Sequence, residues 1–382
     1  MNPQLLSRRR FSVGVGAAAL AGFGVARAQS EGRIVLGQSA PFSGPAAQLG
    51  IQFNQGAKLF FDQLNAAGGI GKRTVEIRTL DDGYEPDRCA ENTRKFIADD
   101  VFALFGYVGT PTSMAALPLF SQAKLPFFAP FTGAESLRQP FNRLVFHVRA
   151  SYYDETALIV RQLVNLGLKK IAVFHQNDAY GKAGLDGVTK ALTEQKLTML
   201  AAATVERNSV DVSAAVEKLV AAKPDAVVQI AAYGASAAFV RAARKAGYGG
   251  TFYNVSFVGT QALADELGKD GAGVVVSQVV PSPYQPSRQI TREFLDAIKK
   301  GGDKVQANYS SMEGFLAARI FTEGLRQAQS SGKITRENLI GGLESIGTQV
   351  ISGFPVSFAP NDHIASHFVE MSMLTGDGRV RT

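Results

Sequence analysis

The chain alternates short runs of β-branched or apolar residues with longer stretches that carry apolar residues every three or four positions. Repeated strand–helix units of this size predict an α/β fold with a parallel sheet covered by helices. In the first part of the chain, strands are expected at 33–37, 74–80, 101–106 and 126–129, and helices at 52–67, 86–99 and 112–122.

The pattern then restarts after a break near 146–153. Strands are expected at 170–175, 201–205, 226–230, 251–254 and 273–280, and helices at 154–166, 181–195, 212–222 and 235–246. Two further helices, at 308–327 and 336–345, precede a tail that predicts two strands, 354–358 and 368–374, around a polar turn. With 382 residues the chain lies near the upper limit for one hydrophobic core, so two lobes are expected.

The first 28 residues have the pattern of an export signal. Ser7, three arginines and Phe11 precede an uncharged run of small and apolar residues at 13–25, and Ala26-Arg27-Ala28 is typical of a signal peptidase site. The arginine motif predicts a twin-arginine signal cleaved after Ala28. The apolar run is shorter than the roughly 20 residues that span a bilayer, so a permanent anchor is not expected.

Composition and charge narrow the functional classes. The formal charge is +7, and four arginines lie in the first 28 residues, which leaves +3 for the remainder and no dense basic block for nucleic acid. Cys89 is the single cysteine, so neither an intrachain disulfide nor a lipid anchor at the cleavage site is predicted. A soluble exported protein of this kind is expected in the periplasm.

The sequence lacks the common catalytic patterns. The sequence contains no nucleophile elbow, phosphate-binding loop or zinc-protease helix motif. His363 and His367 are four residues apart, but they fall in a predicted turn and strand, so no metal site and no cofactor are predicted. Cys89 lies in an apolar helix and is expected to be inert. The chain is therefore not expected to be an enzyme.

Several motifs occur in the order found in one family of binding proteins. They are Ala40-Pro41-Phe42-Ser43-Gly44, the segment 65–72, Leu80-Asp81-Asp82-Gly83, the segment 130–134 and Asp178-Ala179-Tyr180-Gly181. With these motifs the chain resembles the leucine/isoleucine/valine-binding proteins of ABC transporters over essentially its whole length after the signal.

The resemblance implies two Rossmann-like lobes with parallel-core sheets, joined by three crossovers, which is the type I periplasmic-binding-protein fold. It implies lobe 1 at 29–148 plus 279–351, and lobe 2 at 149–278 plus 352–382. It further implies a monomer that closes around a small solute and delivers it to an ABC permease in the inner membrane.

The resemblance also implies a set of ligand-binding residues. Thr110 matches the pocket hydroxyl of the family, and its Thr-Pro-Thr context exposes unpaired helix N–H groups suited to a carboxylate, although an ordinary N-cap role would explain it too. The remaining matches lie on the loop after 126–129, after the first crossover and in the second lobe: Phe131, Thr132, Gly133, Tyr152, Asp154, Tyr180 and Tyr233. Alternatives remain open for each group: a tight turn for the loop at 131–133, a hinge or helix-cap role for Tyr152 and Asp154, and half-exposed loop aromatics for Tyr180 and Tyr233.

One position departs from the family pattern. The family places a glutamate after the strand at 251–254, where it pairs with the ammonium of the ligand, and this chain has Val255-Ser256-Phe257 there. Since a buried ammonium needs a paired carboxylate, either Asp154 replaces the glutamate or the solute carries no amine. The family disulfide is absent as well, with Tyr84 and Gly109 near its expected ends.

Three functions therefore remain open from the sequence. The first is an ABC importer component for an amino acid, the second is the same component for an amine-free aromatic or aliphatic carboxylate, and the third is a sensory binding protein of the same fold. Ser256 marks the position that separates the first two.

Overall fold

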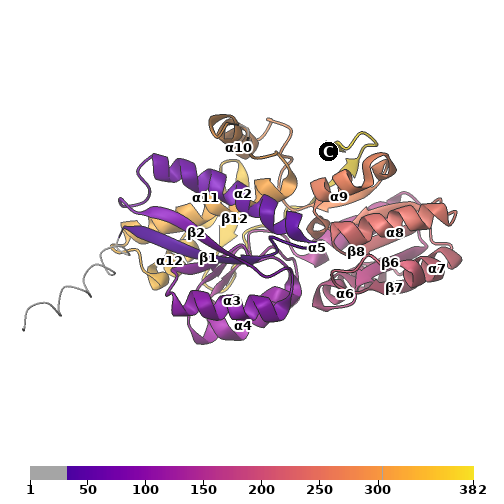
Figure 1. Ribbon diagram of the computed structural model, residues 1–382, viewed down its shortest axis with the longest axis horizontal. Coiled ribbons are helices and arrows are strands. Elements are labelled where there is room, and N and C mark those ends of the chain that lie inside the picture. The colour runs from indigo at the N-terminus through magenta and orange to yellow at the C-terminus, as the bar shows by residue number, and fades with distance from the viewer. Residues whose placement is uncertain (1–31, 303) are drawn as a thin grey trace, which may run out of the picture.

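The computed structural model describes residues 32–302 and 304–382, which form two α/β lobes lying side by side (Figure 1). The predicted export signal, with its cleavage site, lies outside the described residues. Within the part of the chain that the structure describes, no helix is long and apolar enough to cross a membrane.

Lobe 1 contains a five-stranded parallel sheet in the order β2-β1-β3-β4-β5, with helices on both faces. Its strands are β1 (Arg33–Ala40), β2 (Thr74–Asp81), β3 (Ala103–Phe105), β4 (Phe127–Phe128) and β5 (Val145–Phe146). Its helices are α2 (Ala47–Ala66), α3 (Pro86–Ala98), α4 (Thr110–Gln122), α10 (Gln289–Lys300), α11 (Tyr309–Ser330) and α12 (Arg336–Glu344).

Lobe 2 contains a seven-stranded sheet in the order β14-β13-β10-β9-β8-β6-β7. The five strands β6 to β10 are parallel; β13 pairs antiparallel with β10, and β14 pairs antiparallel with β13 at the edge of the sheet. The strands are β6 (Ile171–Gln176), β7 (Ala201–Val205), β8 (Ala226–Ile230), β9 (Thr251–Asn254), β10 (Val275–Gln278), β13 (Glu370–Leu374) and β14 (Val380–Arg381). The helices are α5 (Tyr152–Asn165), α6 (Ala179–Glu194), α7 (Ser213–Ala221), α8 (Tyr233–Lys245) and α9 (Thr260–Leu267).

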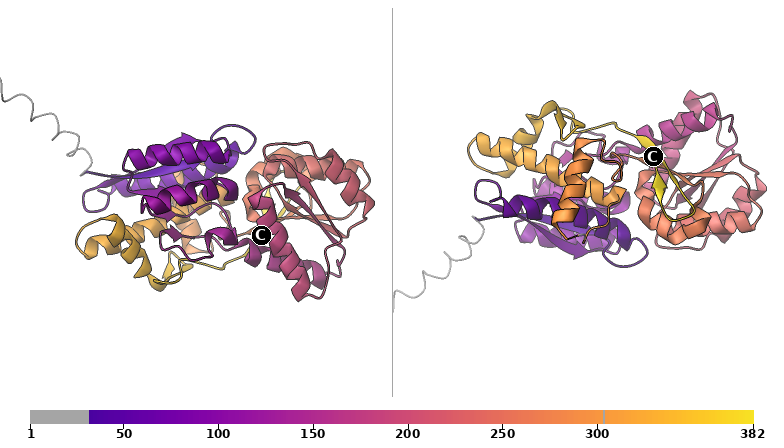
Figure 2. Two further views of the ribbon diagram at one scale, coloured as in Figure 1. Left: turned by 90° about the horizontal axis from the view of Figure 1, so that it is seen from below. Right: turned by 90° about the horizontal axis from the view of Figure 1, so that it is seen from above.

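The chain passes between the lobes three times, after β5, after β10 and after β12, in agreement with the predicted three crossovers. Figure 2 shows the segments around α11 and α12 returning to the lobe that the N-terminal strands form. The predicted boundary at 351/352 is wrong, because β11 (Gly347–Ile351) and β12 (Phe354–Phe358) form one antiparallel hairpin. Phe358 packs edge-on against Phe146 of lobe 1 at 5.4 Å, so the hairpin belongs to lobe 1.

Two glycines allow the closest helix pair of lobe 1 to form. A Cβ on Gly56 of α2 would overlap the backbone carbonyl of Ser311, and a Cβ on Gly314 of α11 would overlap the carbonyl of Phe53. The two helices therefore touch through their backbones, an approach that a larger residue at either position prevents. This contact fixes α11 against α2 and thereby sets where the start of α11 stands relative to the cleft.

The tail of the chain differs from its prediction. The expected strands at 354–358 and 368–374 are present, but they do not pair with each other across the polar turn. The first pairs with β11, which the sequence did not predict, and the second pairs with β10 in the other lobe. The segment between them is the third crossover.

Candidate ligand-binding site between the two lobes

The parallel strands of both sheets end at the junction of the lobes, and the loops after them carry the candidate residues. In open α/β sheets, ligands bind outside the carboxyl ends of the strands. In lobe 1 the relevant loops follow β3 and β4, and in lobe 2 they follow β6, β8 and β9. Six of the nine predicted site residues, Thr110, Phe131, Thr132, Gly133, Tyr152 and Tyr180, come together in one part of this junction.

Three buried hydroxyl groups form the polar part of the junction. The Thr110 and Thr132 hydroxyls are 2.7 Å apart, and the Thr132 hydroxyl is 3.3 Å from the Tyr152 hydroxyl. All three residues are fully buried. We call Thr110, Thr132 and Tyr152 the hydroxyl cluster; it combines the first residue of α4 and the loop after β4, both in lobe 1, with the first residue of α5.

The hydroxyl cluster lies at the start of a helix, α4, whose first turn has no side-chain cap from its N-cap residue. Thr110 begins α4 and follows Gly109, which has a φ of 102° and no side chain with which to cap the helix. Uncapped N–H groups and the positive end of the helix dipole favour an anion. Burial raises the pKa of Tyr152 to about 12, so its hydroxyl stays protonated and can donate.

Gly133 positions the two halves of this cluster. Its carbonyl accepts a hydrogen bond of 2.8 Å from the Tyr152 backbone N–H, and a Cβ at this position would approach the Tyr152 nitrogen to 2.7 Å. Gly133 therefore lets the loop after β4 approach the start of α5 closely. The sequence had predicted a ligand contact or a tight turn for this residue.

Four aromatic rings connect the lobes next to the hydroxyl cluster. The ring of Phe257, from lobe 2, lies 5.9 Å from Tyr84 and 5.7 Å from Phe131 of lobe 1, measured between centroids. It also lies 4.4 Å from Tyr180, whose ring is 5.4 Å from Tyr152. We call Tyr84, Phe131, Tyr180 and Phe257 the aromatic bridge; its members are almost completely buried.

Tyr84 and Gly109 touch at the place where the resemblance had implied the two ends of a disulfide. A Cβ on Gly109 would overlap the Tyr84 ring. Tyr84 itself has a φ of 65°, in the left-handed region that side chains rarely adopt. The ring thus occupies the space next to the start of α4.

A buried ion pair stands behind Phe131. The Arg149 guanidinium lies 4.2 Å above the Phe131 ring and binds both carboxylate oxygens of Glu313, at 2.8 and 2.9 Å. Burial alone would lower the pKa of Arg149, but the charge of Glu313 outweighs it and raises the pKa above its ordinary value. The pair ties the first crossover to the start of α11.

Asp154 does not reach the hydroxyl cluster. It is the third residue of α5, and its carboxylate accepts hydrogen bonds from the Ser151 backbone N–H and hydroxyl in a capping box. The same carboxylate oxygen lies 3.0 Å from Nδ1 of His367. The alternative that the sequence left open, a helix cap, describes its contacts.

Ser256 uses both of its hydrogen-bond donors on a neighbouring carboxylate. Its backbone N–H and its hydroxyl donate to Glu155 at 2.7 and 3.1 Å, and the Ser277 hydroxyl donates to the same group. Glu155 is fully buried, and burial raises its pKa above the ordinary value. These bonds hold α5 against the turn after β9.

Tyr233 lies at the lobe junction but apart from the hydroxyl cluster. Its hydroxyl accepts a hydrogen bond of 3.4 Å from the Gln48 backbone N–H of α2. Nearby, the Leu49 side chain lies so close to Gly259 that a Cβ there would approach it to 2.5 Å. Tyr233 of lobe 2 therefore contacts lobe 1 directly when the lobes are closed, at a place separate from the hydroxyl cluster.

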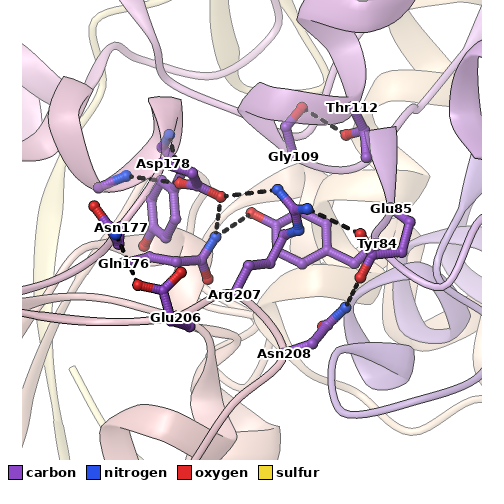
Figure 3. A network of polar contacts seen from close by, with 12 residues as sticks. Tyr84, Glu85, Gly109, Thr112, Gln176, Asn177, Asp178, Glu206, Arg207 and Asn208 are labelled. Atoms are coloured by element: carbon purple, nitrogen blue, oxygen red, sulfur yellow. Dashed lines mark hydrogen bonds and ion pairs between the residues drawn. The ribbon is translucent and has the colours of Figure 1, made fainter. Parts of the chain in front are cut away.

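A polar network closes one side of the junction (Figure 3). Glu85 of lobe 1 accepts hydrogen bonds from Arg207 at 2.9 Å and from Asn208 at 2.7 Å, both on the loop after β7 in lobe 2. Asn208 also donates to the Gly83 carbonyl at 3.1 Å, and Gln176 donates to the Tyr84 hydroxyl at 3.3 Å. We call Glu85, Arg207 and Asn208 the latch.

The two-lobed topology, the crossovers and the site at the strand ends together point to a clamp that encloses a small molecule. A sequence profile of the periplasmic binding protein family matches residues 33–379. The chain belongs to this family.

Three proteins show what this periplasmic binding protein is similar to. Leu/Ile/Val-binding protein homolog 7 of Brucella suis biovar 1 is 25% identical over 389 residues, covering 96% of this chain and 94% of that protein. A possible leucine/isoleucine/valine-binding protein from Rhodopirellula baltica SH 1 is 34% identical in its crystal structure, with a TM-score of 0.86, over 91% of this chain and 95% of that one. A fatty acid ABC transporter substrate-binding protein from Thermomonospora curvata shares the fold at 21% identity, with a TM-score of 0.83, over 91% of each chain.

The predicted family and the predicted two-lobed α/β fold are thus confirmed. Homologues of this periplasmic binding protein are solute-binding proteins, which supports a non-enzymatic role. His363 stacks on Phe146 at 3.7 Å while His367 contacts Asp154, so the two histidines face different partners. Cys89 is buried, and burial raises the pKa of its thiol.

The sequence missed the residues that complete the site from a distance. Phe257, Glu155, Arg149 and the latch carry no local motif that marks them. The one signal that was available was the missing glutamate after β9, because it drew attention to the turn that Phe257 and Ser256 occupy.

Proposed function

We propose that this periplasmic binding protein is the solute-binding component of an ABC importer and that its lobes close on a small solute with a carboxylate group. Export through the twin-arginine route, with cleavage after Ala28, belongs to the same proposal.

The hydroxyl cluster at the start of α4 carries the proposal. Thr110, Thr132 and Tyr152 place three buried hydroxyls beside uncapped helix N–H groups. A carboxylate accepts hydrogen bonds only, so a set of donors and a positive helix end suits it. Tyr180 and Phe257 then cover the rest of the solute from lobe 2.

The importer role rests on relatives and on the closing contacts. The Thermomonospora curvata protein of the same fold is described as part of a fatty acid ABC transporter, and the Brucella relative as a homologue of Leu/Ile/Val-binding proteins. Contacts such as Glu85 with Arg207 can form only when the lobes meet, which supports a closed state distinct from an open one.

Calorimetric titration of the protein from residue 29 onward, against a panel of small carboxylates, tests the binding half of the proposal. Thr110→Val should weaken the best solute at least tenfold, because it removes a hydroxyl from the anion site while keeping the side-chain shape. Thr189→Val, on the exposed face of α6, is the matched control. Equal affinities for the two variants would contradict the assignment.

Transport and sensing are separated by a second measurement. The solute-loaded protein is added to the neighbouring permease and ATPase in vesicles, and ATP hydrolysis is followed. Stimulation of hydrolysis by the loaded form supports the importer role, whereas binding without any stimulation favours the sensory alternative.

A further inference from the structure

The acidic side chains of lobe 2 around the hydroxyl cluster already have protein partners. Glu155 accepts three hydrogen bonds from Ser256 and Ser277. Asp154 is occupied by the cap of α5. Asp178 accepts the first N–H groups of α6 and lies 3.5 Å from Arg207.

The acidic side chains of lobe 1 at the junction are committed as well. Asp82 accepts the Ser39 hydroxyl at 2.7 Å and the Tyr84 backbone N–H at 2.8 Å. Glu313 is bound through both oxygens to Arg149. A ligand ammonium at the cluster would therefore have to take a carboxylate away from donors that the fold itself supplies.

Two buried polar atoms that border the aromatic bridge and can donate, one on Tyr180 and one on Arg149, lack a hydrogen-bond partner in the described residues. Among residues 32–302 and 304–382, neither Tyr180 Oη nor Arg149 Nη1 has a hydrogen-bond partner, and both side chains are at most 1% exposed. Tyr180 packs on Tyr152 and Phe257, and Arg149 lies over Phe131, so both groups border the proposed site. A hydroxyl can also accept, but a guanidinium cannot.

Glu370 is the one half-buried carboxylate near the hinge with an oxygen that has no partner in the described residues. It begins β13, and the charges and hydrogen bonds around it come from Arg288, Ser282 and Tyr309 of the second crossover and α11. Among the described residues, the hydroxyl cluster and the aromatic bridge make their hydrogen bonds and ring contacts without Glu370. It belongs to the hinge.

The turn after β9 places an apolar ring, Phe257, at the junction of the lobes. Phe257 inserts between the lobes against Tyr84, Phe131 and Tyr180. An ammonium next to this bridge would lose its hydration without gaining a paired carboxylate, which is costly. An apolar or aromatic ligand body would instead gain binding free energy there, because its surface is removed from water and packs against aromatic rings.

We infer that the solute is an amine-free carboxylic acid with an apolar or aromatic body, held by the hydroxyl cluster, Arg149 and Tyr180, with Phe257 against its body. This inference rests on the proposed function and names its substrate class. The inferred solute differs from an α-amino acid in one group, because it carries no ammonium next to its carboxylate.

Matched ligand pairs that differ only in the amine test the inference on the protein from residue 29 onward. The pairs are 4-methylpentanoate with leucine and 3-phenylpropanoate with phenylalanine, measured by calorimetric titration. At least one amine-free member should bind 100-fold or more tightly than its amino acid. Tighter binding of an amino acid than of its amine-free partner overturns the inference but leaves the proposed function standing. Absence of binding by all four compounds also overturns the inference. If the wider carboxylate panel fails to bind as well, the proposed function is overturned too.

Two conservative variants sharpen the result. Tyr180→Phe should weaken the amine-free acid about tenfold, because one donor to a charged acceptor is lost. Tyr248→Phe, in the turn between α8 and β9, is the control, since its hydroxyl donates to the Thr251 carbonyl within that turn. Glu155→Gln tests the amino-acid alternative directly: a 100-fold loss in amino-acid affinity, with a much smaller change for the amine-free acid, would show that Glu155 pairs with an ammonium and would overturn the inference.

Discussion

The latch should set much of the affinity without touching the solute. Replacing Glu85 by alanine removes the acceptor of both Arg207 and Asn208. Glu85 is the N-cap position of α3, but its carboxylate makes no capping hydrogen bond to the described residues of that helix, so the fold of lobe 1 should be unaffected. The bonds join residues of opposite lobes, so they exist only when the lobes are closed.

The magnitude follows from exposure. The side chains of Glu85 and Arg207 are 43% and 25% exposed, so solvent screens their ion pair and it contributes about 1 kcal/mol at most. The Asn208 amide adds a hydrogen bond to a partly solvated charge, again about 1 kcal/mol. Losing about 2 kcal/mol from the closed form alone weakens binding by roughly 10- to 30-fold.

Calorimetric titration and stopped-flow dissociation of the bound solute measure the effect. The loss should lie mainly in a faster dissociation rate, and it should shrink in 0.5 M salt because screening weakens the pair in the parent protein. Asp186→Ala removes an exposed ion pair with Lys182 inside α6 and serves as the control with the same charge change. An unchanged dissociation constant for Glu85→Ala, or an equal loss for the control, would refute the reasoning.

Three further predictions concern stability. Arg149→Met should lower the free energy of unfolding by about 3–5 kcal/mol because Glu313 is left buried without a partner, and adding Glu313→Leu should recover most of it in denaturant titrations. Burial raises the pKa of the Asp82 carboxyl from 3.8 to about 6, so the stability that this group contributes at low pH is lost as the pH rises through 6. In urea titrations at each pH, the free energy of unfolding of Asp82→Asn should therefore rise by up to about 3 kcal/mol relative to that of the parent protein between pH 4 and pH 7. Gly56→Ala should cost about 1–3 kcal/mol by forcing α2 from α11, whereas Gly341→Ala, with open space around it, should be neutral or stabilising in thermal melts.

Much of the fold could be predicted because its signals are local. Strand β12 was predicted with the bounds that it has, and the helices after β1, β2 and β3 were expected within a few residues of their positions. Two helices, α9 and α10, were missed, and the hairpin partner of β12 was missed as well. Which strand pairs with which depends on contacts between distant residues, and no window of sequence contains both partners.

The candidate site divides in the same way. The cap role of Asp154 was an available alternative because Ser151 lies three residues before it, within one turn of helix. The partnership of Glu155 with Ser256 spans 101 positions and that of Arg207 with Glu85 spans 122. No local pattern relates such residues.

By itself, the sequence determined the α/β class and the two lobes, because strand–helix periodicity, caps and turn residues act over a few positions. The family and the loops that face the cleft followed from the resemblance that its ordered motifs carry. Only the tertiary structure decided which of the loop residues meet. Closure brings Phe257 onto the rings of lobe 1, ties Ser256 to a buried carboxylate and leaves donors at the site, because the desolvation and pairing of each group depend on everything that folds around it.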